Sequence, residues 1–309
     1  TRNRDAILAR LADDVHTRRE GRILMVPELI SHETERALCR FAGDTASRYA
    51  EVLSFTRLAR RAAEQAGSSA MECLDSGGRV VAMAAAARQL ASKLKAYAAV
   101  ETKPEFLTEL IDAVDEFKRC CITAQDLKAA AAQTEGSLAQ KLEELSLLME
   151  SYDALCSQGK RDPRDQMTWL LEQLEESDYA QTHVFYIDGF PDYTRQHLEI
   201  LEYLIQFSPS VTVSLNCDSI GSRQLAFEKA GQTASEIYRA AQRLNIPVQV
   251  ELIPGREDAL SPMREKLFQG AIQIGACAGC LDTAQADSPW AEVMAAAHRV
   301  RALVQSGCR

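Results

Sequence analysis

The acidic residue Asp188 is the position in this sequence best placed to do chemistry. It directly follows the apolar run from Val184 to Ile187, which is typical of a strand buried on both faces of a parallel sheet. Ligand sites of open α/β sheets form at the carboxyl ends of the strands, so this carboxylate could hold Mg²⁺ beside a phosphate. The alternative is a turn or N-cap aspartate, because Asp188 and Gly189 form a common turn pair.

Other familiar kinds of catalytic or metal site are absent from the sequence. It has no Gly-x-Ser-x-Gly elbow and no Gly-x-x-x-x-Gly-Lys-Ser/Thr phosphate loop. None of the five histidines stands three or four residues from another histidine or from a cysteine, which argues against the usual zinc enzymes. Cys277 and Cys280 have the spacing of a redox pair or half a zinc site, but no second pair accompanies them.

Composition indicates a globular cytoplasmic protein. The chain has 309 residues, 46% hydrophobic and 26% charged, with no apolar run long enough for a membrane span and no signal pattern. An odd count of nine cysteines without framework spacing is typical of reduced thiols. A net charge of -9 argues against a protein that coats nucleic acid, although a narrow DNA track lined by a few arginines remains compatible with it.

Hydrophobic periodicity predicts two stretches of alternating strands and helices. We expect strands at 22–26, 51–55, 184–187, 211–215 and 247–252. We expect helices at 5–15, 31–41 with Ser31 as N-cap, 56–66, 194–207, 224–244 with a break near Gly231, and 290–304. Strands that alternate with helices pair in parallel, so the fold class is α/β.

Between these two stretches the sequence reads as almost entirely helical. Apolar residues from Leu138 to Leu155, and again from Phe106 to Phe117, recur at three- and four-residue steps and predict buried helix faces. We therefore divide the chain into a first α/β part (1–76), a helical insertion (77–177), a second α/β part (178–255), and a linker with the start of another domain (256–309). Both ends look cut from a longer polypeptide.

Several short segments, in this order, resemble AddB, called RexB in some bacteria, the B subunit of the ATP-dependent helicase/nuclease of bacterial recombination. The segments are Met25-Val-Pro-Glu28, Val52-Leu-Ser-Phe-Thr-Arg-Leu-Ala59, Glu116-Phe-Lys-Arg119, Lys141-Leu-Glu-Glu-Leu145, Tyr186-Ile-Asp-Gly-Phe190 and the helix from Leu198 to Leu204. The resemblance implies a RecA-like sheet of the P-loop NTPase type, as in superfamily 1 helicases, with a large all-α insertion. The family's iron–sulfur nuclease domain lies far downstream, so no cysteine here is expected to bind a cluster.

The same resemblance gives Asp188 and its neighbours expected roles. The segment from Asp188 to Asp192, followed by Thr194 and Gln196, is similar to the Asp-Glu-x-x-Asp box in which the Asp binds Mg²⁺ and the Glu positions the attacking water. Gly189 stands where that Glu would be, which predicts poor ATP hydrolysis. In this register, Thr1 is the last residue of a phosphate loop, so binding of ATP and Mg²⁺ depends on residues upstream of it.

A second segment, Ser54-Phe55-Thr56-Arg57, resembles the part of a helicase that follows single-stranded DNA. Hydroxyls and an arginine can contact phosphates, and an aromatic ring can stack on a base. The alternative places Phe55 in the core and Arg57 at a solvated helix start.

Two functions are consistent with these observations. The first is a catalytically weak, helicase-like scaffold that holds and scans single-stranded DNA beside an active AddA-type helicase/nuclease subunit, forming a heterodimer with no membrane contact. In the resembled family, this region is expected to read the recombination hotspot on the emerging strand. The second is an active ATP-dependent DNA translocase, against which Gly189 argues.

Overall fold

The computed structural model describes residues 2–69, 71–98, 103–255, 260, 261, 263 and 284–308. The chain divides into two compact units, Thr1–Ile253 and Pro254–Arg309. The first unit contains the sheet and the helices discussed below. In the second, α13 (Pro289–Gln305) begins after Ser288, whose hydroxyl accepts a hydrogen bond from the Ala291 N–H and caps the helix.

Four short strands form an all-parallel sheet at the centre of the first unit. They are β1 (Arg22–Met25), β2 (Ala50–Leu53), β3 (Val184–Ile187) and β4 (Val211–Val213), arranged in the order β2-β1-β3-β4. Met25 is in register with Leu53 on one side and Ile187 on the other, so the carboxyl ends of these strands share one edge. The predicted α/β class and four of the five predicted strands are confirmed.

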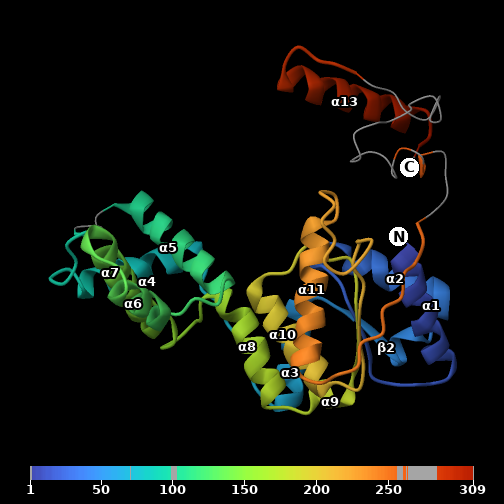
Figure 1. Ribbon diagram of the computed structural model, residues 1–309, viewed down its shortest axis with the longest axis horizontal. Helices are drawn as coiled ribbons and strands as arrows, with labels where there is room; N and C mark the ends of the chain where they lie inside the picture. The colour runs from blue at the N-terminus through green and yellow to red at the C-terminus, as the bar shows by residue number, and fades with distance from the viewer. Residues whose placement is uncertain are drawn as a thin grey trace. The chain divides into compact units, whose positions relative to one another are not determined.

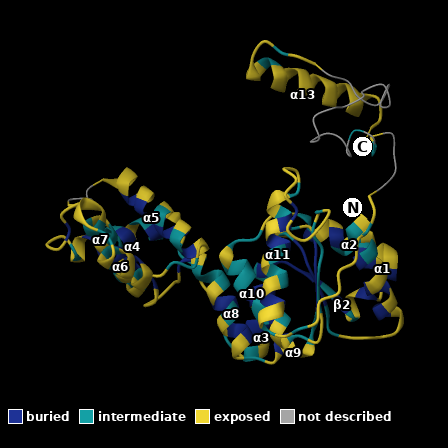
Figure 2. Ribbon diagram, viewed as in Figure 1, coloured by how far each residue is buried: buried dark blue, intermediate teal, exposed yellow. Residues whose placement is uncertain are grey.

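Helices cover both faces of this sheet, which explains why its central strands β1 and β3 are mostly apolar (Figure 1). Along β1, Leu24 packs with α1 (Arg2–His16) and α2 (Ser31–Ala42) in one cluster. Its neighbours Ile23 and Met25 join the opposite cluster, with α3 (Phe55–Ala66), α8 (Gln166–Glu175) and α10 (Arg195–Phe207). In Figure 2 the buried residues lie on the strands and on the helix sides that face them.

A separate core lies within the helical segment. Residues of α4 (Ser76–Gln89), α5 (Pro104–Arg119), α6 (Ala124–Ala132) and α7 (Gly136–Cys156) form one buried cluster, in which Met149 and Tyr152 represent the predicted α7 stripe. The first residue of each predicted stripe is not buried as expected: Leu138 is 54% exposed and Phe106 is 37% exposed. The helical character predicted for this segment is confirmed.

The two connections between the α/β part and the helical segment, called the crossings below, lie side by side. Cys73 and Arg161 form a parallel β-bridge, in which the Arg161 N–H donates to the Glu72 carbonyl and the Leu74 N–H donates to the Arg161 carbonyl, both at 2.8 Å. Behind the second crossing, the 3-10 helix η4 (Pro163–Asp165) leads directly into α8. The segment therefore leaves and rejoins the α/β part at one place.

Three local predictions are wrong. Residues 247–252 lie outside every strand, although Val248, Val250 and Leu252 alternate as in a strand. Helix α11 (Glu228–Arg243) runs through Gly231 without a break. The glycine serves close packing instead, since a Cβ built there would lie 2.6 Å from the backbone nitrogen of Ser222. Ser31 is the first residue of α2 and its hydroxyl donates to the Glu28 carbonyl at 2.9 Å, so it is not the N-cap of α2.

The remaining short elements connect these layers. They are the 3-10 helices η1 (Glu28–Ile30) and η2 (Ala46–Arg48) and the single turn α9 (Tyr179–Thr182). None of the helices within the described ranges is long and apolar enough to cross a membrane.

Candidate functional site

The Asp188 carboxylate is fixed by residues from three elements at the carboxyl edge of the sheet. The backbone N–H of Asp188 extends β3 by donating to the Met25 carbonyl at 2.9 Å, and the residue is only 2% exposed. Arg4 of α1 donates from Nε to Oδ2 at 3.0 Å, and Ser214, just after β4, donates its hydroxyl to Oδ1. The predicted position of Asp188 is confirmed, whereas its role as a metal ligand stays a prediction.

Gly189 has a backbone conformation that suits glycine and few other residues. Its φ is +80°, and a Cβ built there would lie 3.0 Å from Ile30 Cδ1, 3.2 Å from Arg4 Nη2 and 3.6 Å from Pro27 Cδ. A glutamate at this position would have both an unfavourable φ and crowded surroundings. A side chain at this position would therefore strain the backbone and require the ends of the Ile30 and Arg4 side chains to shift.

The first turn of α1 lies at the same edge of the sheet. Asn3 donates from Nδ2 to the Leu215 carbonyl at 3.2 Å and to Asn216 Oδ1 at 3.3 Å, both just beyond β4. Together with the Arg4–Asp188 pair, these bonds tie the start of α1 to the ends of β3 and β4. Thr1, the predicted phosphate-loop residue, lies outside the described residues.

Gln196, the other predicted nucleotide-binding residue, contacts a different part of the molecule. It lies in the first turn of α10, where Thr194 and His197 form a reciprocal capping box. The Gln196 side chain donates from Nε2 to the Arg164 carbonyl of η4 at 3.3 Å. The structure thus joins Gln196 to the crossing into the helical segment, while Asp188 is held by α1 and the loop after β4.

The predicted DNA-binding segment forms the start of α3. Ser54 is buried, caps the helix by accepting from the Arg57 N–H at 3.3 Å, and donates its hydroxyl to the Glu28 carboxylate. Thr56 donates to Gln166 Oε1 at 3.3 Å. The Arg57 side chain is 39% exposed and donates to Glu35 Oε1 at 2.8 Å, so its guanidinium is accessible but already ion-paired.

Phe55 lies in the core, as the alternative interpretation of this segment has it. It is 5% exposed, stacks on the His197 ring at a centroid distance of 4.4 Å and contacts Phe190 edge-on at 5.2 Å. Burial lowers the pKa of His197, although Asp192 acts in the opposite direction, and Nδ1 of the ring accepts from the Thr194 N–H at 3.3 Å. This aromatic contact between the two candidate segments has no signature in the sequence.

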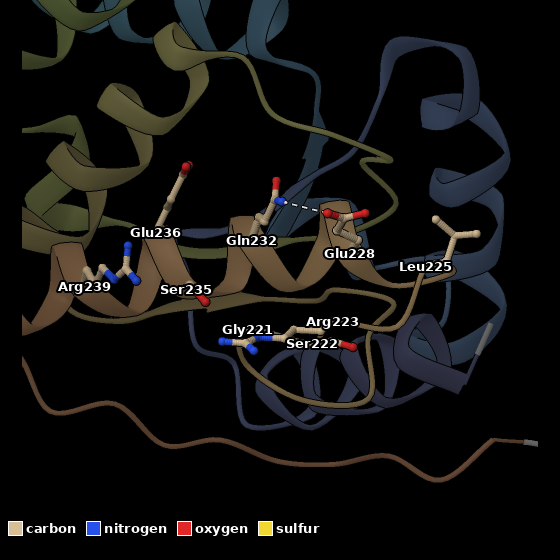
Figure 3. Close-up of a pocket in the computed structure, with 9 residues that line it drawn as sticks. All are labelled: Gly221, Ser222, Arg223, Leu225, Glu228, Gln232, Ser235, Glu236 and Arg239. Carbon is tan, nitrogen blue, oxygen red and sulfur yellow. Dashed lines mark hydrogen bonds between the residues drawn. The ribbon is translucent and has the colours of Figure 1, made fainter. Parts of the chain in front are cut away.

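Two surface hollows lie near these segments. One, of about 310 Å³, is lined by Arg57 and Arg61 of α3, each ion-paired to a glutamate, Glu35 or Glu51. The other, of about 570 Å³, lies between α11 and the loop before it, with Arg223 and Arg239 set among acidic residues (Figure 3). Figure 3 labels its lining: Gly221, Ser222, Arg223, Leu225, Glu228, Gln232, Ser235, Glu236 and Arg239. Their mixed charges give neither hollow a strong preference for anions.

No three His, Cys, Asp or Glu side chains converge on a possible metal position among the residues that the structure describes. The pair Cys277 and Cys280 lies outside those residues. A Mg²⁺ ion at this edge of the sheet would have the Asp188 carboxylate and the Ser214 hydroxyl as its oxygen ligands. The Arg4 guanidinium already lies beside them. A divalent cation fits this set poorly, because it would stand next to a fixed positive charge.

Comparison with known proteins identifies the family. A family model described as "ADDB, N-terminal" matches residues 3–265. The B subunit of the ATP-dependent helicase/deoxyribonuclease of Thermoanaerobacter sp. is 33% identical over 199 residues, which is 64% of this chain and 17% of that protein. The proteins of the same name from Clostridium tetani and Clostridium acetobutylicum are 28% and 26% identical, over 82% and 74% of this chain and 23% and 20% of their own lengths.

This chain spans about a fifth of the length of these relatives. The family model nevertheless covers most of the chain, including all four strands, the helical segment, Asp188 and the segment from Ser54 to Arg57. The chain therefore belongs to the family of AddB N-terminal regions, as its sequence motifs predict.

Proposed function

We propose that this chain is the helicase-like region of the B subunit of a helicase/deoxyribonuclease, with a RecA-like sheet, and that it holds single-stranded DNA without hydrolysing ATP. Membership in the AddB N-terminal family supports the assignment to that subunit and to DNA repair. The parallel sheet, with an acid at the end of β3 and the start of α1 beside it, is consistent with a RecA-like arrangement.

One observation carries the proposed lack of hydrolysis, namely the conformation of Gly189. Phosphoryl transfer to water depends on a group that positions the water, and loss of a positioned base costs about 10²–10⁴ in rate. At this position the φ of +80° and the close approach of the Ile30 and Arg4 side chains disfavour a side chain. We therefore expect the region to share the sheet of a motor domain but to lack the group that positions water for ATP hydrolysis.

The start of α3 is the proposed contact with DNA. Thr56 and Arg57 can reach phosphates, while the buried Ser54 and Phe55 hold the helix end in place. Arg57 would exchange its ion pair with Glu35 for a phosphate oxygen, so affinity should fall as salt rises. An active AddA-type subunit is the partner that would deliver the strand.

Measurement of DNA-stimulated ATPase activity tests this function. Purified protein should hydrolyse ATP no faster than an Asp188→Ala variant, since neither has a complete acidic box. Circular dichroism checks that both are folded. Robust turnover in the wild type that disappears in the variant would instead establish an active translocase.

Replacement of Arg57 by alanine should weaken binding to labelled single-stranded DNA several-fold and reduce the slope of log affinity against log salt by about one. The matched control is Arg61→Ala, on the same helix and also paired with glutamates, where a smaller change is expected. Fluorescence anisotropy across a salt series measures both. Equal affinity of wild type and Arg57→Ala would remove Arg57 from the DNA track.

A further inference from the structure

The buried carboxylate of Asp188 requires a positive charge nearby. Its side chain is 4% exposed, and burying an ionised carboxylate without a partner is costly. In a working acidic box, the magnesium ion supplies the compensating charge. Here the Arg4 guanidinium lies at 3.0 Å from Oδ2, and the Ser214 hydroxyl satisfies Oδ1. The carboxylate is therefore compensated by the protein itself.

The position of Arg4 depends on the glycine that follows Asp188. A Cβ at Gly189 would lie 3.2 Å from Arg4 Nη2. The guanidinium therefore lies next to the place where a side chain at position 189 would begin. The arginine occupies space that a glutamate would need, and it contributes charge that a metal would otherwise supply. Gly189 and Arg4 thus form one arrangement.

We infer that Arg4 is a built-in cation that takes the place of Mg²⁺ at Asp188, so that this edge of the sheet does not bind divalent cations. The guanidinium is part of the chain and donates to the carboxylate, so it cannot leave the site as a bound metal ion can. A dication beside this guanidinium would be repelled, and Mg²⁺ also requires several oxygen ligands in near-octahedral geometry. This inference is about the binding of a metal ion, so it can be tested separately from the proposed loss of ATP hydrolysis.

Thermal unfolding of four proteins tests the role of the pair. Arg4→Ala leaves Asp188 buried without its counter-ion and should lower Tm by roughly 5–10 °C. Arg10→Ala is the matched control, since Arg10 lies on the same helix but pairs with Glu251 where both side chains are about half exposed, and its Tm should barely change. The double variant Arg4→Ala/Asp188→Asn should recover part of the loss.

Cation binding is measured separately, by following free Mn²⁺ with electron paramagnetic resonance in the absence of nucleotide. Wild type and Asp188→Asn should give the same titration curve. Binding of Mn²⁺ by the wild type that Asp188→Asn abolishes would overturn the inference. A Tm loss in Arg4→Ala no larger than that in Arg10→Ala would overturn it as well. Because no ATP is present, these outcomes are independent of the ATPase result.

Discussion

Replacement of Asp162 by alanine is expected to lower the free energy of unfolding by about 3–5 kcal/mol. Asp162 is fully buried behind the crossing into the helical segment. Its Oδ2 accepts from Arg79 Nη2 at 3.2 Å and lies 3.5 Å from Lys118 Nζ, while Oδ1 accepts from the Arg164 N–H at 2.8 Å. One carboxylate thus joins α4, α5 and η4.

The expected loss is large because both cations stay charged in the folded protein. Burial acts to lower the pKa of Lys118, but the carboxylates of Asp165, Asp153 and Asp162 outweigh it and raise the pKa. Burial likewise acts to lower the pKa of Arg79, but the hydrogen bonds to Asp115 and Tyr152 and the charge of Asp162 together outweigh it and the pKa is raised. Removal of Asp162 therefore leaves two buried positive charges with less compensation.

Urea unfolding monitored by circular dichroism measures this effect, with Asp153→Ala as the control. Asp153 also pairs with Lys118, at 2.8 Å, but its side chain is 40% exposed. Its removal should cost less, about 1 kcal/mol, because this partner of the buried Lys118 is itself partly solvated. Similar losses in the two variants would contradict the view that burial of Asp162 sets the size of the effect.

A second large effect is expected when Gly189 is replaced by glutamate, the residue of an active acidic box. Stability should fall by about 1–3 kcal/mol, because the side chain must adopt a φ of +80° and displace Ile30 and Arg4. ATPase activity should not appear, since the new carboxylate cannot take its working position while the backbone keeps this conformation. Thermal unfolding and an ATPase assay with single-stranded DNA measure the two results.

Two alanine variants separate the causes of this strain. Gly67 also has a positive φ, +74°, but nothing lies within 4 Å of a Cβ built there. Gly67→Ala should therefore show the cost of the backbone conformation alone, and Gly189→Ala that cost plus the contacts with Ile30 and Arg4. Equal losses would mean that the surroundings of Gly189 can yield. Appearance of ATPase activity in Gly189→Glu would contradict the view that the backbone conformation at 189 keeps a new carboxylate from its working position.

The sequence predicts those parts of this fold that depend on neighbouring residues. The runs that become β1 and β3 are apolar except for Arg22 because both faces of the sheet are covered, and Asp188 follows β3 as expected. The start of α3 likewise has a local cause, since Ser54 is a good N-cap.

Features that depend on distant residues could not be predicted. The alternation at 247–252 is that of a strand, but whether a strand forms depends on a partner with free backbone groups. Gly231 looks like a helix break, yet it permits close contact with Ser222. The pair of Arg4 and Asp188 joins residues 184 positions apart, and no local pattern marks it.

Because the crossings at Cys73 and Arg161 are adjacent, the helical segment between them, here called the cassette, could be removed by deletion. Since the chain departs and returns through neighbouring backbone positions, a linker of a few residues could join them at little entropic cost. Asp162 would then lose Arg79 and Lys118, so a shortened protein should also carry an uncharged residue at 162. Such a protein would allow the contribution of the cassette to DNA or partner binding to be assigned by subtraction.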